Sequence, residues 1–308
     1  MNMKRVILLA ILGLAFALNF GVPANAGFFS DKKALKEQAQ YEKNCKKDIL
    51  EVFAKQGEYV KKYDIEGLKS LYAPDFVDND GYNKDVYFSL VGDTWETYPD
   101  ITYTTKIKNI KLNGDYATVE TEESAVATSD ELDKHIIGEL NSYSNCIYHL
   151  QKLGGQWEII GENVTDEFST LKYGDARYLK MTLETPRMIG ANKNYAATLK
   201  VEAPENSIVV ASLNQEKIVN PATKPEEHFM KLREDNTLAR IFTSNTDNIN
   251  EYIVASIGVT GLNTTADGNI KVLMNGLAFV MSRVNVVPIN NFARVDDKKD
   301  KKDKADEQ

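Results

Sequence analysis

Two acidic residues and one histidine are the candidates for acid–base chemistry in this chain. Asp78 and Asp80 belong to the run Asp78-Asn79-Asp80-Gly81, and His149 lies in a segment with the composition of a strand. A carboxylate or an imidazole beside a substrate can remove or supply a proton. Each has a plainer interpretation. The acidic run is typical of a solvated turn, and strand alternation places His149 opposite Tyr148, half exposed on a sheet.

Four aromatic residues are candidates for the wall of a ligand pocket near these groups. Tyr72, Tyr87, Trp95 and Tyr148 lie on segments that must pack against one another if the first half folds as one unit. Aromatic residues at helical spacing are also common in an ordinary core. Both interpretations stay open at this point, as a pocket or as a filled core.

Other catalytic and metal-binding patterns are absent from the sequence. It has no nucleophile elbow, no glycine-rich phosphate loop and no His-Glu-x-x-His helix. The three histidines, His135, His149 and His228, are far apart along the chain. Asp78-Asn79-Asp80-Gly81 differs from a calcium loop, because its glycine comes too early and the glutamate at position twelve is missing. We therefore expect neither a metal nor a cofactor.

The first 26 residues have the pattern of a secretory signal. Lys4 and Arg5 precede an apolar run over residues 6–20, and Ala24-Asn25-Ala26 has the small-x-small form that signal peptidase cleaves. The run is shorter than the ~20 residues that span a membrane. Cleavage after Ala26 is expected, which predicts a periplasmic or secreted protein that is not inserted in the membrane.

The charge of the chain limits its partners. The formal charge is −8, and removal of Lys4 and Arg5 with the signal lowers it to −10. An acidic protein repels phosphate backbones and anionic lipids, so nucleic acid and membrane surfaces are not expected partners. The expected partners are therefore a small molecule, a peptide or another protein.

Cys45 and Cys146 are the only cysteines. Cys45 falls on the apolar stripe of a long helix, and that stripe must face the sheet that holds Cys146. In an exported protein this predicts a Cys45–Cys146 disulfide. The alternative is two buried thiols that act as small apolar residues.

Helices precede strands in the first half, which predicts an α+β domain over residues 31–173. Asp64 is a natural N-cap for the second helix, and Asn113-Gly114-Asp115 and Gly154-Gly155 are hairpin turns. The polar stretch 129–144 is expected to be a connection. The expected helices cover residues 31–63, 64–72 and 84–96, and the expected strands cover 101–112, 116–127, 146–153 and 157–164.

Four short motifs occur in order along the first half: Leu71-Tyr72-Ala73-Pro74-Asp75-Phe76, Tyr98-Pro99-Asp100-Ile101, Gly114-Asp115-Tyr116-Ala117-Thr118-Val119 and Gly155-Gln156-Trp157-Glu158-Ile159. Together with the predicted helices, their order resembles the SnoaL-like branch of the nuclear transport factor 2-like superfamily over about residues 40–170. The resemblance implies a cone of three helices on a curved antiparallel sheet, with a pocket between them. The superfamily includes enzymes, ligand binders and assembly modules, so the fold does not transfer a function.

The second half predicts a separate β-sandwich over residues 178–295. Its short strands are bounded by turn residues and cover residues 195–203, 208–218, 238–244, 252–260 and 270–287. It is immunoglobulin-like in architecture only, and it is expected to contact a protein partner. The charged run 296–308 predicts a disordered tail.

Three classes of function remain. The first is an exported, non-catalytic binding protein with a pocket for a small molecule or peptide. The second is a structural envelope or assembly protein whose pocket is filled by its own side chains. The third is an isomerase, cyclase or hydrolase that uses an acid–base pair, as the resemblance implies.

Overall fold

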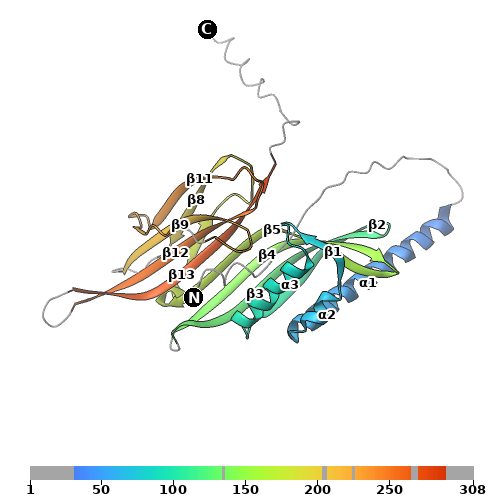
Figure 1. Cartoon of the computed structure of the whole chain (residues 1–308), viewed down its shortest axis with the longest axis horizontal. Helices are drawn as coiled ribbons and strands as arrows, with labels where there is room; N and C mark the ends of the chain where they lie inside the picture. The colour runs from blue at the N-terminus through green and yellow to red at the C-terminus, as the bar shows by residue number, and fades with distance from the viewer. Residues whose placement is uncertain (1–30, 134–135, 203–206, 224–225, 265–269, 289–308) are drawn as a thin grey trace, which may run out of the picture.

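The computed structural model describes residues 31–133, 136–202, 207–223, 226–264 and 270–288 (Figure 1). The predicted signal at residues 1–26 and the predicted tail at 296–308 lie outside the described residues. Within the described ranges, no helix has the length and apolar character needed to cross a membrane.

Three α-helices occur in the described residues, close to the predicted positions: α1 (Asp31–Lys61), α2 (Ile65–Lys69) and α3 (Lys84–Thr97). Asp64 caps α2, since its side chain accepts a hydrogen bond from the Gly67 N–H at 2.9 Å. Asn83 caps α3 in the same way by accepting from the Val86 N–H. The caps explain why both helices begin where the sequence predicts.

Five strands accompany these helices: β1 (Tyr72–Asp78), β2 (Thr102–Asn113), β3 (Tyr116–Asp133), β4 (Ile136–Leu153) and β5 (Gln156–Gly174). The hairpin turns at Gly114 and Gly154 are confirmed, with both glycines at positive φ. The prediction that residues 129–144 form a connection is wrong, because most of this stretch belongs to β3 and β4. The buried Ser142 hydroxyl in this stretch is satisfied across strands, by a 2.7 Å hydrogen bond with the Ser169 hydroxyl.

The strands of the second half are β6 (Met181–Glu184), β7 (Met188–Gly190), β8 (Asn194–Val201), β9 (Ser207–Lys217), β10 (Met230–Lys231), β11 (Thr237–Thr243), β12 (Glu251–Thr264) and β13 (Ile270–Val287), preceded by a 3₁₀ turn, η2 (Asp175–Tyr178). Five of these strands, β7, β9, β10, β12 and β13, join the strands of the first half in one sheet. That sheet has ten strands in the order β10-β9-β12-β13-β5-β4-β3-β2, with β1 on β5 and β7 on β13, and β11-β8-β6 form a second sheet.

The predicted fold class, an α+β cone followed by a separate β-sandwich, is therefore wrong. The described chain is mostly β, and one large, predominantly antiparallel sheet runs through both halves. The physical reason is the length of β5 and β13. The second half of β5 extends past the part of the sheet that the helices cover, and there it pairs with β13. Their register aligns Leu277 with Tyr173 and Gly276 with Gly174.

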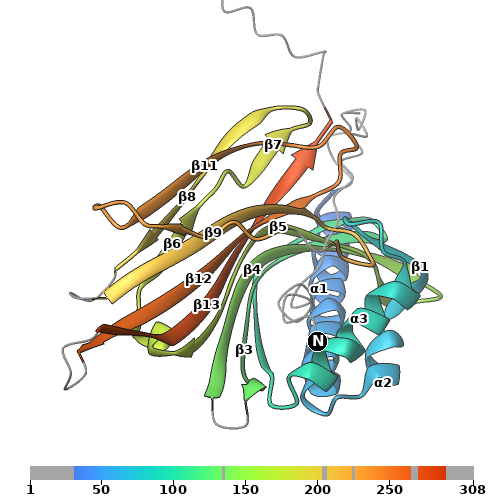
Figure 2. The same ribbon diagram turned by 60° about the vertical axis from the view of Figure 1, so that its left-hand side comes forward.

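The helices gather on one side of this sheet, over β1 to β5, as Figure 2 shows. One buried apolar cluster lies between the helices and the sheet and includes Ile49, Phe76 and Leu150. A second cluster is built from the three-stranded sheet and β9, β12 and β13, and includes Leu199, Ile257 and Val280. Two cores thus share one sheet, and independent folding of residues 31–173 and 178–295 stays a prediction.

Candidate functional site

A cavity of about 580 Å³ lies between the helices and the sheet. Phe53 of α1 borders it. The four aromatic residues expected to wall a pocket also border it, namely Tyr72 of β1, Tyr87 and Trp95 of α3, and Tyr148 of β4. That these residues bind a ligand stays a prediction.

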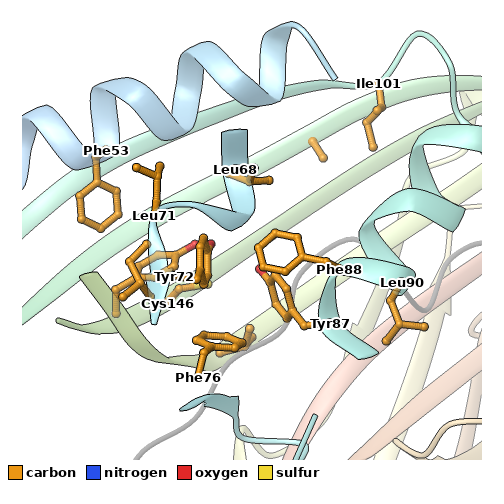
Figure 3. Close-up of a cluster of buried hydrophobic side chains, with 14 of the residues drawn as sticks. Phe53, Leu68, Leu71, Tyr72, Phe76, Tyr87, Phe88, Leu90, Ile101 and Cys146 are labelled. Carbon is orange, nitrogen blue, oxygen red and sulfur yellow. The ribbon is translucent and has the colours of Figure 1, made fainter. Parts of the chain in front are cut away.

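The aromatic rings pack in pairs beside the cavity and do not fill it. Tyr72 contacts Tyr87 and Phe88 with ring centroids 5.8 and 4.9 Å apart, and these side chains gather below α2 and against α3 in Figure 3. Phe53 meets Tyr148 edge to face at 5.2 Å. Edge-to-face contacts hold aromatic rings in defined orientations. The wall is therefore organised by its own side chains.

Two glutamates, which the sequence analysis did not single out, also border the cavity. Glu162 of β5 is only 1% exposed and accepts a hydrogen bond from the Tyr87 hydroxyl at 2.7 Å. Glu123 of β3 is half-buried and accepts from the hydroxyls of Tyr148 at 2.9 Å and Thr121 at 3.0 Å. Ligand atoms of the two carboxylates lie within 4.8 Å of each other and of the Cys146 sulfur.

Burial perturbs both carboxyl groups. Desolvation raises the pKa of Glu162 well above its usual value, and the nearby Glu123 charge raises it further. Desolvation also raises the pKa of Glu123, although its hydrogen bonds to Tyr148 and Thr121 oppose the change. Two adjacent negative charges in a low-dielectric site repel strongly. The pair therefore favours a proton, or another cation, between its members.

The structure does not place the candidate acids Asp78 and Asp80 among the residues that border this cavity. The Asp80 side chain is fully buried and forms an ion pair with the fully buried side chain of Arg283 of β13, with Nη2 to Oδ1 at 2.7 Å and Nη1 to Oδ2 at 3.1 Å. Asp78 accepts from the backbone N–H groups of Asp80 and Tyr82. The acidic run forms a turn as predicted, but the Asp80 side chain is not solvated, because its partner Arg283 lies in the second half of the chain.

His149 also lies away from the cavity. Because side chains alternate along a strand, His149 points to the face of β4 opposite Tyr148 and Cys146. A Cβ built on Gly161 of β5 would lie 3.9 Å from the His149 side chain, on that opposite face. His149 is half-buried there. This agrees with the plainer interpretation, in which His149 is a sheet residue and not a base.

The predicted disulfide is not formed, since Cys45 and Cys146 are both free and buried. Phe53, which contacts Tyr148, fixes the register of α1 on the sheet. Cys45 lies eight residues before Phe53, about 12 Å along the helix. Tyr41, one turn further, donates to Asp115 at the β2–β3 turn. Cys146 lies on the other side of Tyr148 from that turn, because it pairs with Thr121. The apolar stripe of α1 therefore faces the sheet, but it places Cys45 nearer the β2–β3 turn than Cys146 is.

The group of Glu123, Cys146 and Glu162 has the proximity that a metal site needs. Its chemistry is less suitable, because a metal ligates the thiolate and not the thiol. Burial and the two glutamate charges raise the pKa of the Cys146 thiol well above its usual value. The Ser144 hydroxyl lies 3.4 Å from its sulfur. The thiol is therefore neutral at physiological pH unless a metal ion displaces its proton.

Comparisons with known proteins give only partial likenesses. No family model matches the chain, and no curated protein gives a significant match. A structure of Bd1075 from Bdellovibrio bacteriovorus is 20% identical over 38% of this chain and 39% of that one, with a TM-score of 0.32. A ketosteroid isomerase-like protein from Erwinia carotovora atroseptica SCRI1043 is 16% identical over 38% of this chain and 91% of that one, with a TM-score of 0.30.

The predicted resemblance of residues 40–170 stays a prediction, because neither neighbour is similar enough to test it. The chain spans well under half of the Bd1075 structure. At these TM-scores neither match supports a conclusion about function, which must come from the cavity itself.

Proposed function

We propose that this chain is an exported binding protein that takes a small, largely apolar molecule with a polar group into the cavity between the helices and the sheet. The observation that carries the proposal is the cavity itself, about 580 Å³ with an aromatic wall and two carboxylates inside it. Small-molecule sites are generally concave, mostly apolar and equipped with a few convergent polar groups.

Binding without catalysis is favoured over a filled structural pocket, because a volume of this size remains beside the packed rings. It accommodates a molecule of metabolite size. Export rests on the predicted signal over residues 1–26 and is part of the same proposal.

A second candidate function is acid–base catalysis by Glu123 and Glu162. The observation that favours it is their position, since carboxyl groups with raised pKa values inside a cavity are common at catalytic sites. In such a reaction one glutamate would remove a proton and the other, protonated, would donate a hydrogen bond to the developing oxyanion.

A pair of glycine substitutions tests the proposal. Gly57 borders the cavity on α1 and Gly92 lies on α3, and a Cβ added at either one meets no atom within 4 Å. Gly57→Trp should place an indole ring at the cavity without a clash at its Cβ, and Gly92→Trp is its matched control on a helix. We expect compounds that raise the melting temperature of the wild type and of Gly92→Trp to lose this effect in Gly57→Trp.

Equal binding by both variants would refute a ligand site in this cavity. Product analysis of the bound compounds separates the two candidate functions. Binding alone leaves the compounds unchanged. Catalysis converts them at a rate that Glu123→Gln or Glu162→Gln lowers about a hundredfold or more.

A further inference from the structure

We propose that the ligand of this cavity is a small organic cation, an amine carried on an aromatic or other apolar group. The inference rests on the proposed binding function and adds the charge of the ligand to it. Three features of the cavity carry it, namely two carboxyl groups without a basic partner in the described residues, an aromatic wall and its size.

The first feature is a pair of carboxylates without a basic partner. Glu123 and Glu162 receive hydrogen bonds only from hydroxyl groups of Tyr148, Thr121 and Tyr87 among the contacts of the described chain. No salt bridge joins either of them to a lysine or arginine of the described residues. A buried carboxylate is costly unless a cation or a proton accompanies it.

The arrangement of the neighbouring hydroxyls fits a charged guest. Tyr87 and Tyr148 each use the hydroxyl proton toward a carboxylate, which holds the two acids in place. The Tyr72 hydroxyl accepts a hydrogen bond from the Gln56 amide at 3.0 Å. An ammonium group between the two carboxylates would donate to both and would need no rearrangement of these hydroxyls.

The second feature is the aromatic wall. Phe53, Tyr72, Tyr87 and Tyr148 border the same cavity as the two acids. The faces of aromatic rings attract cations, most strongly where water is excluded. The same rings accommodate the apolar part of an amine. An anionic ligand would meet two carboxylates that form no salt bridge with a basic residue of the described chain, and a neutral ligand would leave the pair dependent on a proton for its neutralisation.

The third feature, the size of the cavity, favours an organic cation over a metal ion. A single ion needs only a few ligand atoms, whereas the cavity encloses about 580 Å³. Cys146, the third member of the possible metal group, does not border the cavity among its lining residues. A metal ion would also have to displace the proton of this buried thiol.

Binding of an amine has a proton signature. The ionisable groups facing Glu162 are Asp78 and Tyr72 of β1, Tyr87 of α3, Glu123 of β3, and Cys146 and Tyr148 of β4. All of the neighbouring phenols and the thiol have raised pKa values and stay neutral. An arriving ammonium ion therefore displaces the proton held by the glutamate pair, and that proton passes to the buffer.

The experiment uses matched trios of probes on the full chain. Benzylamine, benzyl alcohol and benzoate form one trio, and the phenethyl and naphthylmethyl series give two more with the same ring and three different charges. Binding is measured by calorimetry at pH 7 in two buffers with different heats of ionisation. We expect an amine of at least one trio to bind at least about tenfold more tightly than its alcohol, with proton release.

Glu162→Gln should abolish this preference and the proton release, and Glu158→Gln, on the same strand but outside the cavity lining, should leave both unchanged. Glu123→Gln replaces Glu162→Gln if that variant does not fold. Alcohols or carboxylates that bind as tightly as the amines would overturn this inference and leave the proposed binding function standing.

Suppose that the Gly57→Trp comparison has shown binding of other compounds in the cavity. Failure of every probe in these trios to bind would then overturn only the inference that the ligand is an amine. Stoichiometric Zn²⁺ binding that Cys146→Ser and Glu162→Gln both abolish, without amine binding, would overturn the inference in favour of a metal site.

Discussion

Replacement of Asp80 by asparagine should destabilise the protein strongly, although Asp80 lies on a turn that the sequence predicts to be solvated. Arg283 donates Nη1 and Nη2 to the two Asp80 oxygens, Nη2 to the Asn79 oxygen and Nε to the Asn285 oxygen. The side chains of both members of the ion pair are 0% exposed. Asparagine keeps only one acceptor and turns an N–H₂ group toward the guanidinium.

The expected magnitude follows from this burial. Removal of one member of a buried ion pair costs about 3–5 kcal/mol, because the other charge is left without compensation. Asn79 and Asn285 continue to accept from Arg283, which places the cost near the lower value. With about 2–4 °C per kcal/mol for a protein of this size, the melting temperature should fall by about 6–12 °C.

The assay is urea unfolding followed by circular dichroism, with an exposed ion pair as the control. Lys217 and Asp247 are 2.6 Å apart, and their side chains are 42% and 54% exposed. Asp247→Asn should therefore cost less than about 1 kcal/mol. The double variant Asp80→Asn/Arg283→Met should be less destabilised than the sum of its single variants, because it leaves no unpaired charge. Equal losses of the free energy of unfolding in Asp80→Asn and Asp247→Asn would show that burial of the Asp80–Arg283 ion pair adds nothing to the cost of breaking it.

Three further predictions concern pH, the thiols and export. Burial and the Asp80 charge raise the pKa of Asp78 to about 7, so the native state holds a proton that the unfolded chain releases near pH 4. Because of Asp78, the free energy of unfolding therefore falls as the pH rises from about 4 to 7. The Asp78→Asn variant should lose up to about 1.4 kcal/mol per pH unit of this decline. Identical pH profiles of the free energy of unfolding for the wild type and the variant would contradict this. Cys45 and Cys146 should resist a thiol reagent in the native protein and both react in unfolded, unreduced protein, whereas no reaction after unfolding would indicate a disulfide. The exported chain should begin at Gly27, and an intact mass that retains residues 1–26 would contradict cleavage after Ala26.

The sequence predicts the elements that local chemistry controls. Asp64 begins a helix and Gly114 turns a hairpin because each acts within a few residues of itself. The path of the large sheet depends on pairing between β5 and β13, more than a hundred residues apart, which no local pattern specifies. The buried position of Asp80 has the same origin, since Arg283 is 203 residues away.

The two cavity glutamates differ in how far the sequence indicates them. Glu123 has the same parity along β3 as Val119 and Ala125, both fully buried, so strand alternation alone places it on the inner face. Glu162 shares the inner face with Ile159 although the two differ in parity, because the register of β5 on β4 shifts between Ile159 and Gly161. Such a bulge reverses the faces of the residues that follow it. Only the structure reveals that Glu162 joins Glu123.

A crystal structure of the protein soaked with the compounds that bind would show whether the cavity is a ligand site. We expect electron density for the compound inside the cavity, in contact with Tyr148 and Trp95 and with its amine between Glu123 and Glu162. A cavity closed by the aromatic rings packing against one another, or a compound bound elsewhere on the molecule, would contradict it.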